Sequence, residues 1–113
     1  MKKLLLLGLL VIAVLIFGSA SSAVADETTN GARIFQNYCW ACHMGGGNVI
    51  IAYKTLKLPA LEKYKMNSMA AIVNQVRNGK SAMPAFRGRL SEREIQDVAA
   101  YVLVKSDTGW QSS

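Results

Sequence analysis

Cys39-Trp40-Ala41-Cys42-His43 is the stretch that decides the fold of this 113-residue chain. Two cysteines three positions apart, with a histidine directly after the second, form the C-x-x-C-H pattern of covalent haem attachment. One helical turn separates the two thiols, so each can add to one vinyl group of the same haem. The neighbouring histidine then lies under the iron. The motif therefore predicts thioether bonds from Cys39 and Cys42 and an axial iron ligand at His43, the only histidine in the chain.

Other uses of a C-x-x-C pair fit the rest of the sequence less well. A thioredoxin-like redox pair opens a helix after a strand in an α/β chain, and no such pattern precedes Cys39. A zinc site needs four ligands, and the chain offers only two cysteines and one histidine. A structural disulfide would close a very short loop and stabilise little. A thiol–disulfide oxidoreductase remains the remote alternative.

The sixth coordination position of the iron needs a ligand from farther along the chain. The candidates are the methionines after the motif: Met44, Met66, Met69 and Met83. Met44 adjoins His43 and cannot reach the opposite face of a haem. Met69 belongs to an apolar helical stripe, where core packing is the favoured interpretation, whereas Met66 could either pack or ligate. Met83 is in a loop stiffened by Pro84, far enough from the motif to wrap around the cofactor.

A His/Met pair raises the reduction potential and closes both axial positions of the iron. A closed iron does not readily bind substrate or oxygen, so this ligation favours electron transfer over catalysis. A haem sensor or a peroxidase-like enzyme is the alternative, and it requires an open or displaceable sixth position.

The remaining sequence predicts an all-α fold of three main helices and one short helix. The first main helix is expected over Gly31–Tyr38, with Thr29 or Asn30 as its N-cap. The short helix runs from Pro59 to Tyr64. The second main helix starts after a cap at Asn67 or Ser68 and ends before Gly79, and the third follows the capping box Ser91-x-x-Glu94. Gly31 lets the first and last helices cross closely.

Residues 1–25 have the layout of a secretory signal peptide. Lys2 and Lys3 precede the apolar run Leu4–Phe17, and an Ala-x-Ala site ends at Ala25. The run is too short to span a membrane comfortably, since a span needs roughly 20 residues. We therefore expect cleavage, which leaves a single domain over 26–113. A domain of this size builds only a marginal core from side chains alone, so a cofactor fits well.

The charge of the predicted mature chain is mildly basic. Loss of Lys2 and Lys3 lowers the formal net charge from +6 to +4. No long basic run exists, so we expect no nucleic-acid partner. A mildly basic protein is instead steered toward an acidic protein surface, in a way that salt weakens.

With these motifs in place, the chain resembles the cytochrome c6 family, the soluble class I c-type cytochromes of photosynthetic electron transport. The resemblance is carried by Gly31-x-x-x-Phe35-x-x-x-Cys39-x-x-Cys42-His43, Gly45-Gly46, Asn48-Val49, Lys54-Thr55-Leu56, Ala60-Leu61-Glu62-Lys63-Tyr64, Gln75-Val76, Asn78-Gly79-Lys80-x-Ala82-Met83-Pro84-Ala85-Phe86, Gly88-Arg89-Leu90-Ser91, Val98-Ala99-x-Tyr101-Val102 and Gly109-Trp110. It implies a small class I cytochrome c fold over 26–113, wrapped around one covalently bound haem c. Gly47 and Arg87 depart from the expected pattern without touching ligation.

The resemblance also implies a function and its partners. It implies a monomeric electron carrier, not an enzyme, between the cytochrome b6f complex and photosystem I in the thylakoid lumen. The alternative is a respiratory donor to a terminal oxidase, in the lumen or a bacterial periplasm. In the family, Gln75 would lie near the haem and help keep the potential high, although it could be an ordinary polar helix residue. Asn48 and Lys54 would approach the haem propionates, and Arg89 would contact the photosystem, unless Lys54 and Arg89 are simple surface charges.

Overall fold

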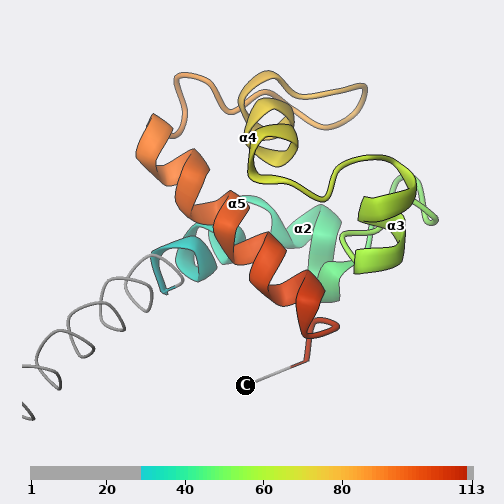
Figure 1. The fold of residues 1–113 in the computed structure, drawn as a ribbon. Helices are drawn as coiled ribbons and strands as arrows, with labels where there is room; N and C mark the ends of the chain where they lie inside the picture. The colour runs from blue at the N-terminus through green and yellow to red at the C-terminus, as the bar shows by residue number, and fades with distance from the viewer. Residues whose placement is uncertain (1–28, 112–113) are drawn as a thin grey trace, which may run out of the picture.

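The computed structural model describes residues 29–111, which form helices joined by loops (Figure 1). Residues 29–38 are helical. They are followed by α2 (Trp40–His43), the 3-10 helix η1 (Met44–Gly46), α3 (Leu58–Lys63), α4 (Met69–Asn78) and α5 (Glu92–Asp107). Within the described range the only β pairings are two isolated bridges, so the predicted all-α fold is confirmed. The predicted signal peptide, 1–25, lies outside the described residues.

The helix caps agree with the sequence at two of three positions. The Ser68 side chain accepts a hydrogen bond from the Ala71 amide at the start of α4, and Ser91 forms the full capping box with Glu94 on α5. The cap predicted at Thr29 or Asn30 is wrong, because both residues are already helical. Asn30 makes a tertiary bond instead: its side-chain amide donates to Asp97 Oδ2 at 2.6 Å.

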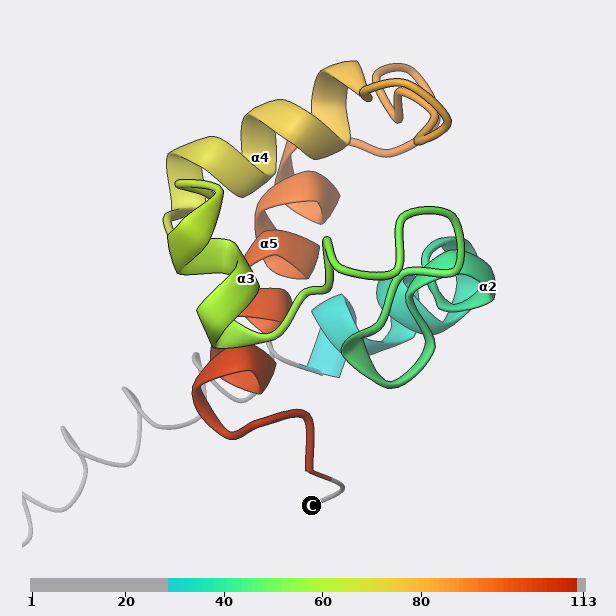
Figure 2. The ribbon, with the colours of Figure 1, turned by 90° about the vertical axis from the view of Figure 1, so that its right-hand side faces the viewer.

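The helix of residues 29–38 crosses α5 closely at Gly31, as predicted (Figure 2). A Cβ atom on Gly31 would collide with the Asp97 carbonyl oxygen and lie 2.7 Å from the Tyr101 Cβ. Arg93 supports the same junction by donating to Asp97 Oδ1 at 3.2 Å. The crossing fixes α5 against the chain segment that leads into the C-x-x-C-H motif.

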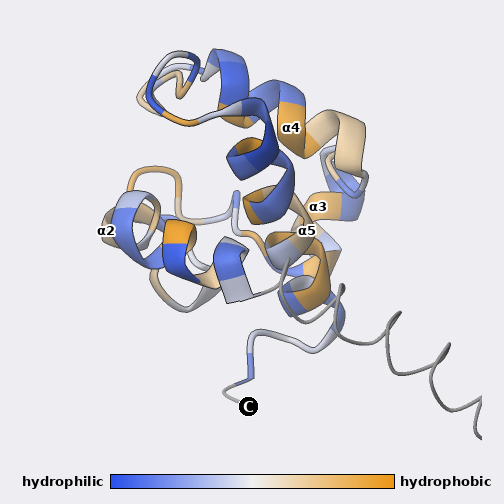
Figure 3. Ribbon diagram, turned by 90° about the vertical axis from the view of Figure 1, so that its left-hand side faces the viewer, coloured by the Kyte–Doolittle hydropathy of each residue, from blue (hydrophilic) through white to orange (hydrophobic). Residues whose placement is uncertain are grey.

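Apolar and polar residues alternate along the helices (Figure 3), and α3, α4 and α5 each contribute apolar residues to the core. The buried apolar residues are Ile34, Phe35, Leu61, Ile72, Val76, Phe86, Leu90, Ile95, Val98, Ala99 and Val102. The apolar residues Ile95, Val98, Ala99 and Val102 of α5 are therefore in the core. The core position predicted for Met69 is wrong. Met69 is the first residue of α4 and is 39% exposed, because the first turn of that helix extends past the core.

Candidate functional site

A central cavity of about 390 Å³ brings together all but one of the predicted site residues. These lining residues are Cys39, Cys42, His43, Asn48, Lys54, Gln75 and Met83. Arg89 lies outside the lining. Much of the apolar core forms the wall, including Phe35, Val76 and Val98. The core is thus built around a space of the size that proteins use for small-molecule ligands.

The C-x-x-C-H motif reaches the cavity because the chain stays helical through it. The Cys39 amide donates to the Phe35 carbonyl at 2.9 Å, and the His43 amide donates to the Cys39 carbonyl at 2.9 Å. The two cysteines are therefore one helical turn apart, as the motif requires.

A backbone hydrogen bond holds the imidazole ring of His43 in place. Its Nδ1 is 2.9 Å from the Gly47 carbonyl oxygen. A carbonyl can only accept, so the contact favours the neutral tautomer that carries its proton on Nδ1 and leaves the Nε2 lone pair for a metal. Since His43 lines the cavity, the contact orients the ring as an iron ligand would need.

The thiol chemistry argues against a disulfide oxidoreductase. Burial raises the pKa of Cys39 to about 11, and the nearby Cys42 adds to the rise. Nucleophilic cysteines depend on a lowered pKa, because the thiolate is the reactive species. In the part of the chain that the structure describes, no group of three or more His, Cys, Asp or Glu side chains could hold a metal ion, which also leaves the zinc alternative without support.

Met83 approaches the cavity on a tight turn. Lys80 and Met83 exchange two backbone hydrogen bonds of 3.0 and 2.9 Å across Ser81-Ala82. Ser81 has a φ of +53°, and Gly79 has a φ of +70° where a Cβ would lie 2.6 Å from the Met83 carbonyl oxygen. Glycine is therefore required where the chain leaves α4. The turn holds the Met83 backbone in one geometry.

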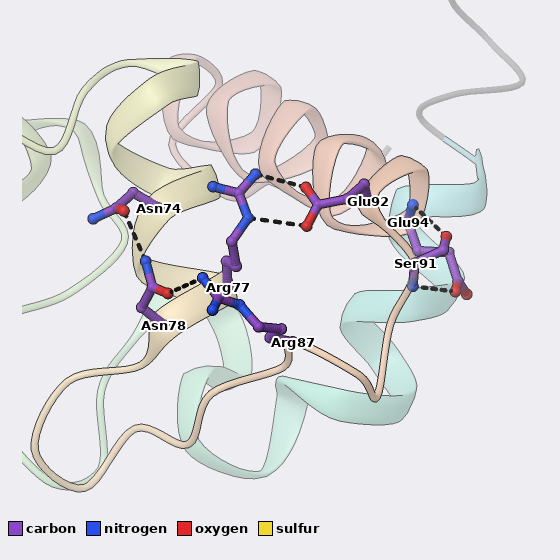
Figure 4. A network of polar contacts seen from close by, with 7 residues as sticks. All are labelled: Asn74, Arg77, Asn78, Arg87, Ser91, Glu92 and Glu94. Atoms are coloured by element: carbon purple, nitrogen blue, oxygen red, sulfur yellow. Dashed lines mark hydrogen bonds and ion pairs between the residues drawn. The ribbon is translucent and has the colours of Figure 1, made fainter.

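Polar contacts join the end of this loop to α4, and α4 to α5 (Figure 4). Arg87 donates to Asn78 Oδ1 at 2.9 Å, and the Asn78 amide donates to Asn74 at 2.8 Å. Arg77 forms two hydrogen bonds to Glu92, at 3.0 and 2.6 Å, which join the end of α4 to the start of α5. Sequence reasoning missed this network. Its only signal was a basic residue in the last turn of one helix and an acidic residue in the first turn of the next.

Gln75 contacts the sulfur of Met83. Its side-chain amide donates to the Met83 sulfur at 3.8 Å. Met66 also lines the cavity. Met44 is 50% exposed. The contact from Gln75 and the rigid turn support Met83 as the sulfur ligand.

The remaining predicted residues stand at the rim. Asn48 uses its side chain to close its own loop, donating to the Lys54 carbonyl and accepting from the Ile50 and Ile51 amides. The Lys54 ammonium lies 5.3 Å from the centre of the Tyr64 ring. A role for Asn48 and Lys54 at haem propionates stays a prediction.

Arg89 is exposed and stacks on a wall residue. Its guanidinium carbon lies 4.8 Å from the centre of the Phe86 ring, and Phe86 is buried and lines the cavity. The positive charge is therefore held one side chain away from the cavity. Its contact with a partner stays a prediction.

These residues fit a covalently attached haem. The cavity offers two thiols one turn apart, an oriented imidazole and a thioether, and imidazole with thioether is an axial pair of c-type cytochromes. The cavity takes up space among the apolar core residues of a small domain, which a bound cofactor would fill.

Known proteins of similar sequence and structure carry related descriptions. A family model described as cytochrome c oxidase, cbb3-type, subunit III matches residues 26–102. A cytochrome c6 of Nostoc sp. is 54% identical over 111 residues, covering 98% of this chain and 100% of the relative. A cytochrome c6 of Parathermosynechococcus lividus is 60% identical over 84 residues, covering 74% and 97%. The crystal structure of cytochrome c6 from the diatom Phaeodactylum tricornutum has a TM-score of 0.72 at 49% identity and covers 74% of this chain and 98% of its own.

Proposed function

Because this chain belongs to the cytochrome c6 family, we propose that it carries single electrons from the cytochrome b6f complex to photosystem I in the thylakoid lumen. Membership makes it an electron-transfer protein with one covalently bound c-type haem, not an enzyme. The observation that carries the proposal is the meeting of the C-x-x-C-H motif and Met83 at one cavity. Export through a signal peptide over 1–25 accounts for the proposed location.

Four side chains would hold the haem. Cys39 and Cys42 would form the two thioether bonds, and His43 and Met83 would occupy the axial positions of the iron. When bound, the haem iron supplies a reversible one-electron couple between Fe(II) and Fe(III). If His43 and Met83 both bound the iron, no position on the metal would be open to a substrate, which suits a carrier.

The neighbours of the axial ligands keep the geometry constant. The His43 contact to Gly47 and the paired backbone bonds of Lys80 and Met83 hold both ligands before any electron moves. A carrier benefits from this rigidity because neither ligand needs to move between the two charge states. With Met83 as the sulfur ligand, the hydrogen bond from the Gln75 amide would withdraw electron density from the sulfur and so would favour the reduced iron.

Basic residues at and near the cavity would attract an acidic surface on the partner. Lys54 and Lys80 line the cavity, and the exposed Arg87 and Arg89 flank the wall residue Phe86. Opposite charge on the partner would raise the encounter rate, and salt screens such an attraction beyond about 8 Å at 0.15 M ionic strength. We therefore expect the rate of photosystem I reduction to fall as ionic strength rises.

Flash photolysis with isolated photosystem I tests both points. The reduced protein should re-reduce the flash-oxidised reaction centre, and Arg89→Gln should slow this more at low salt than at high salt. Lys57→Gln, an exposed lysine remote from Phe86 in the chain, is the matched control. Failure to reduce photosystem I would reject the proposed acceptor. Rates that do not vary with salt would reject the steering.

A respiratory role is the second candidate. The family model described as a cbb3-type oxidase subunit favours it, because this chain shares that domain over residues 26–102. The two roles differ in acceptor and not in chemistry. Oxidation of the reduced protein by purified terminal oxidase, compared with photosystem I at equal ionic strength, decides which acceptor is preferred.

A further inference from the structure

Trp110 lies near the C-terminal end of the chain, yet it is connected to the loop that orients His43. Its indole N–H donates to the Leu56 carbonyl at 2.9 Å, although the two residues are 54 positions apart. The Leu56 amide in turn donates to the Gly46 carbonyl at 2.8 Å. The next residue, Gly47, provides the carbonyl oxygen that accepts a hydrogen bond from His43 Nδ1 at 2.9 Å. We propose that Trp110 is a positioning residue for the His43 imidazole.

Packing adds a second connection between the same groups. A Cβ atom on Gly46 would lie 2.5 Å from three atoms of the Trp110 ring, so the indole rests directly on the Gly46 backbone. Trp110 also packs against the cavity wall: its ring centre is 5.1 Å from that of Phe35, which lines the cavity. The indole thus supports the Gly46-Gly47 segment both by a hydrogen bond through Leu56 and by direct contact.

The backbone of Trp110 shows that these contacts hold the residue firmly. Its φ is +62°, in the left-handed region that is unfavourable for a bulky side chain. Such a conformation persists only where the surroundings determine it. The Trp110 amide donates to the Lys105 carbonyl at 2.8 Å, and Tyr101 of α5 packs edge-on against the indole at 6.1 Å. The C-terminal half of α5 therefore holds the indole ring of Trp110 against the backbone of Gly46.

The sign of the effect follows from the hydrogen bond to His43. A carbonyl that accepts from Nδ1 makes the imidazole a stronger donor to iron, which favours the oxidised state. If the support from Trp110 is lost, Gly47 is less well held and the Nδ1 hydrogen bond weakens. The reduction potential should then become more positive. This inference rests on the proposed function, specifically on His43 as an axial ligand.

The test compares the two tryptophans of the chain in the haem-containing protein. Trp110→Phe keeps an aromatic ring and removes the N–H donor. Trp40→Phe is the matched control, because Trp40 is 42% exposed and does not line the cavity. The readouts are the reduction potential and the hydrogen-exchange rate of the His43 Nδ1 proton, followed by NMR in the reduced state. A purely structural role would lower stability without moving either readout.

We expect a more positive potential and faster Nδ1 exchange in Trp110→Phe, with both unchanged in Trp40→Phe. If either readout in the folded Trp110→Phe protein matches the unmodified protein, the inference is overturned. If Trp110→Phe yields no folded protein, benzothienylalanine replaces Trp110 in the Trp40→Phe background. It keeps the ring shape without the N–H, and the same two criteria apply. Photosystem I reduction by the unmodified protein tests the proposed function separately, so the two failures are distinguishable.

Discussion

The side-chain amide of Gln75 donates to the sulfur of Met83 at 3.8 Å, and both residues line the central cavity. Gln75 is on α4, and Met83 is on the turn that follows this helix. The contact links the residue that the family resemblance placed near the haem to the proposed sulfur ligand. It gives a physical reason for a role of Gln75 in setting the potential, since a donor on the sulfur reduces electron donation to iron.

Gln75→Leu is expected to lower the reduction potential. Leucine is close to glutamine in size but has no donor for the Met83 sulfur, so the sulfur donates more strongly and the oxidised iron gains stability. Redox titration of the purified protein measures the change. Gln96→Leu, an exposed position on α5, is the control. An unchanged potential in Gln75→Leu would mean that the contact has no electronic effect.

Met83→Ala should abolish the weak absorption band at the red edge of the ferric spectrum that marks methionine–iron ligation. Met66→Ala should keep it, because Met66 lines the cavity without the support of Gln75 or the Lys80–Met83 turn. The two spectra, recorded side by side, assign the ligand. Loss of the band in Met66→Ala and its survival in Met83→Ala would reverse the assignment.

Glu92 should contribute a pH-dependent part of the stability. The hydrogen bond from Arg77 is the main cause that lowers the pKa of Glu92, with the charges of Arg77 and Arg87 adding and desolvation opposing. A carboxyl whose pKa is lower in the folded than in the unfolded state stabilises the fold above its unfolded pKa. That contribution disappears as the pH falls through the lowered, folded pKa.

Thermal unfolding of the haem-containing protein across acidic pH checks this sign. The unmodified protein should be more stable than Glu92→Gln above the ordinary glutamate pKa, and the difference should shrink as the solution is acidified. Glu62→Gln, an exposed carboxyl on α3, should show no comparable difference. A stability gap that widens on acidification would contradict the assignment.

The chain without haem should be largely unfolded. Cys39→Ala/Cys42→Ala removes both predicted attachment points, and the cavity of about 390 Å³ then lies unfilled in a small core. A domain of this size builds only a marginal core from its own side chains. Circular dichroism measures the outcome. A native-like helical spectrum from the haem-free variant would refute the dependence of the fold on its cofactor.

The sequence predicted those features that depend on local patterns. Ser68 and Ser91 cap their helices as expected, since a cap involves only residues within one turn. The crossing at Gly31 was also predictable, because a residue without a side chain marks close approach. The cavity lining includes Cys39, Cys42, His43, Gln75 and Met83, whose roles at a haem stay predictions.

Features that depend on distant contacts were beyond the sequence. The residue type of Asn30 predicts a helix cap, whereas its side chain instead donates a hydrogen bond to Asp97, 67 positions away in the chain. Met69 fits the apolar period of α4, but the period does not show where the core ends. Trp110 gave no sign that its indole reaches Leu56, since nothing near either residue encodes the contact.

The most direct measurement of the central claim is the intact mass of the exported protein, with mass analysis of the peptide that spans Cys39–His43. Attachment of haem to both cysteines predicts one added haem mass, located on that peptide and resistant to acid and organic extraction. A polypeptide with unmodified thiols and no added tetrapyrrole would contradict the account.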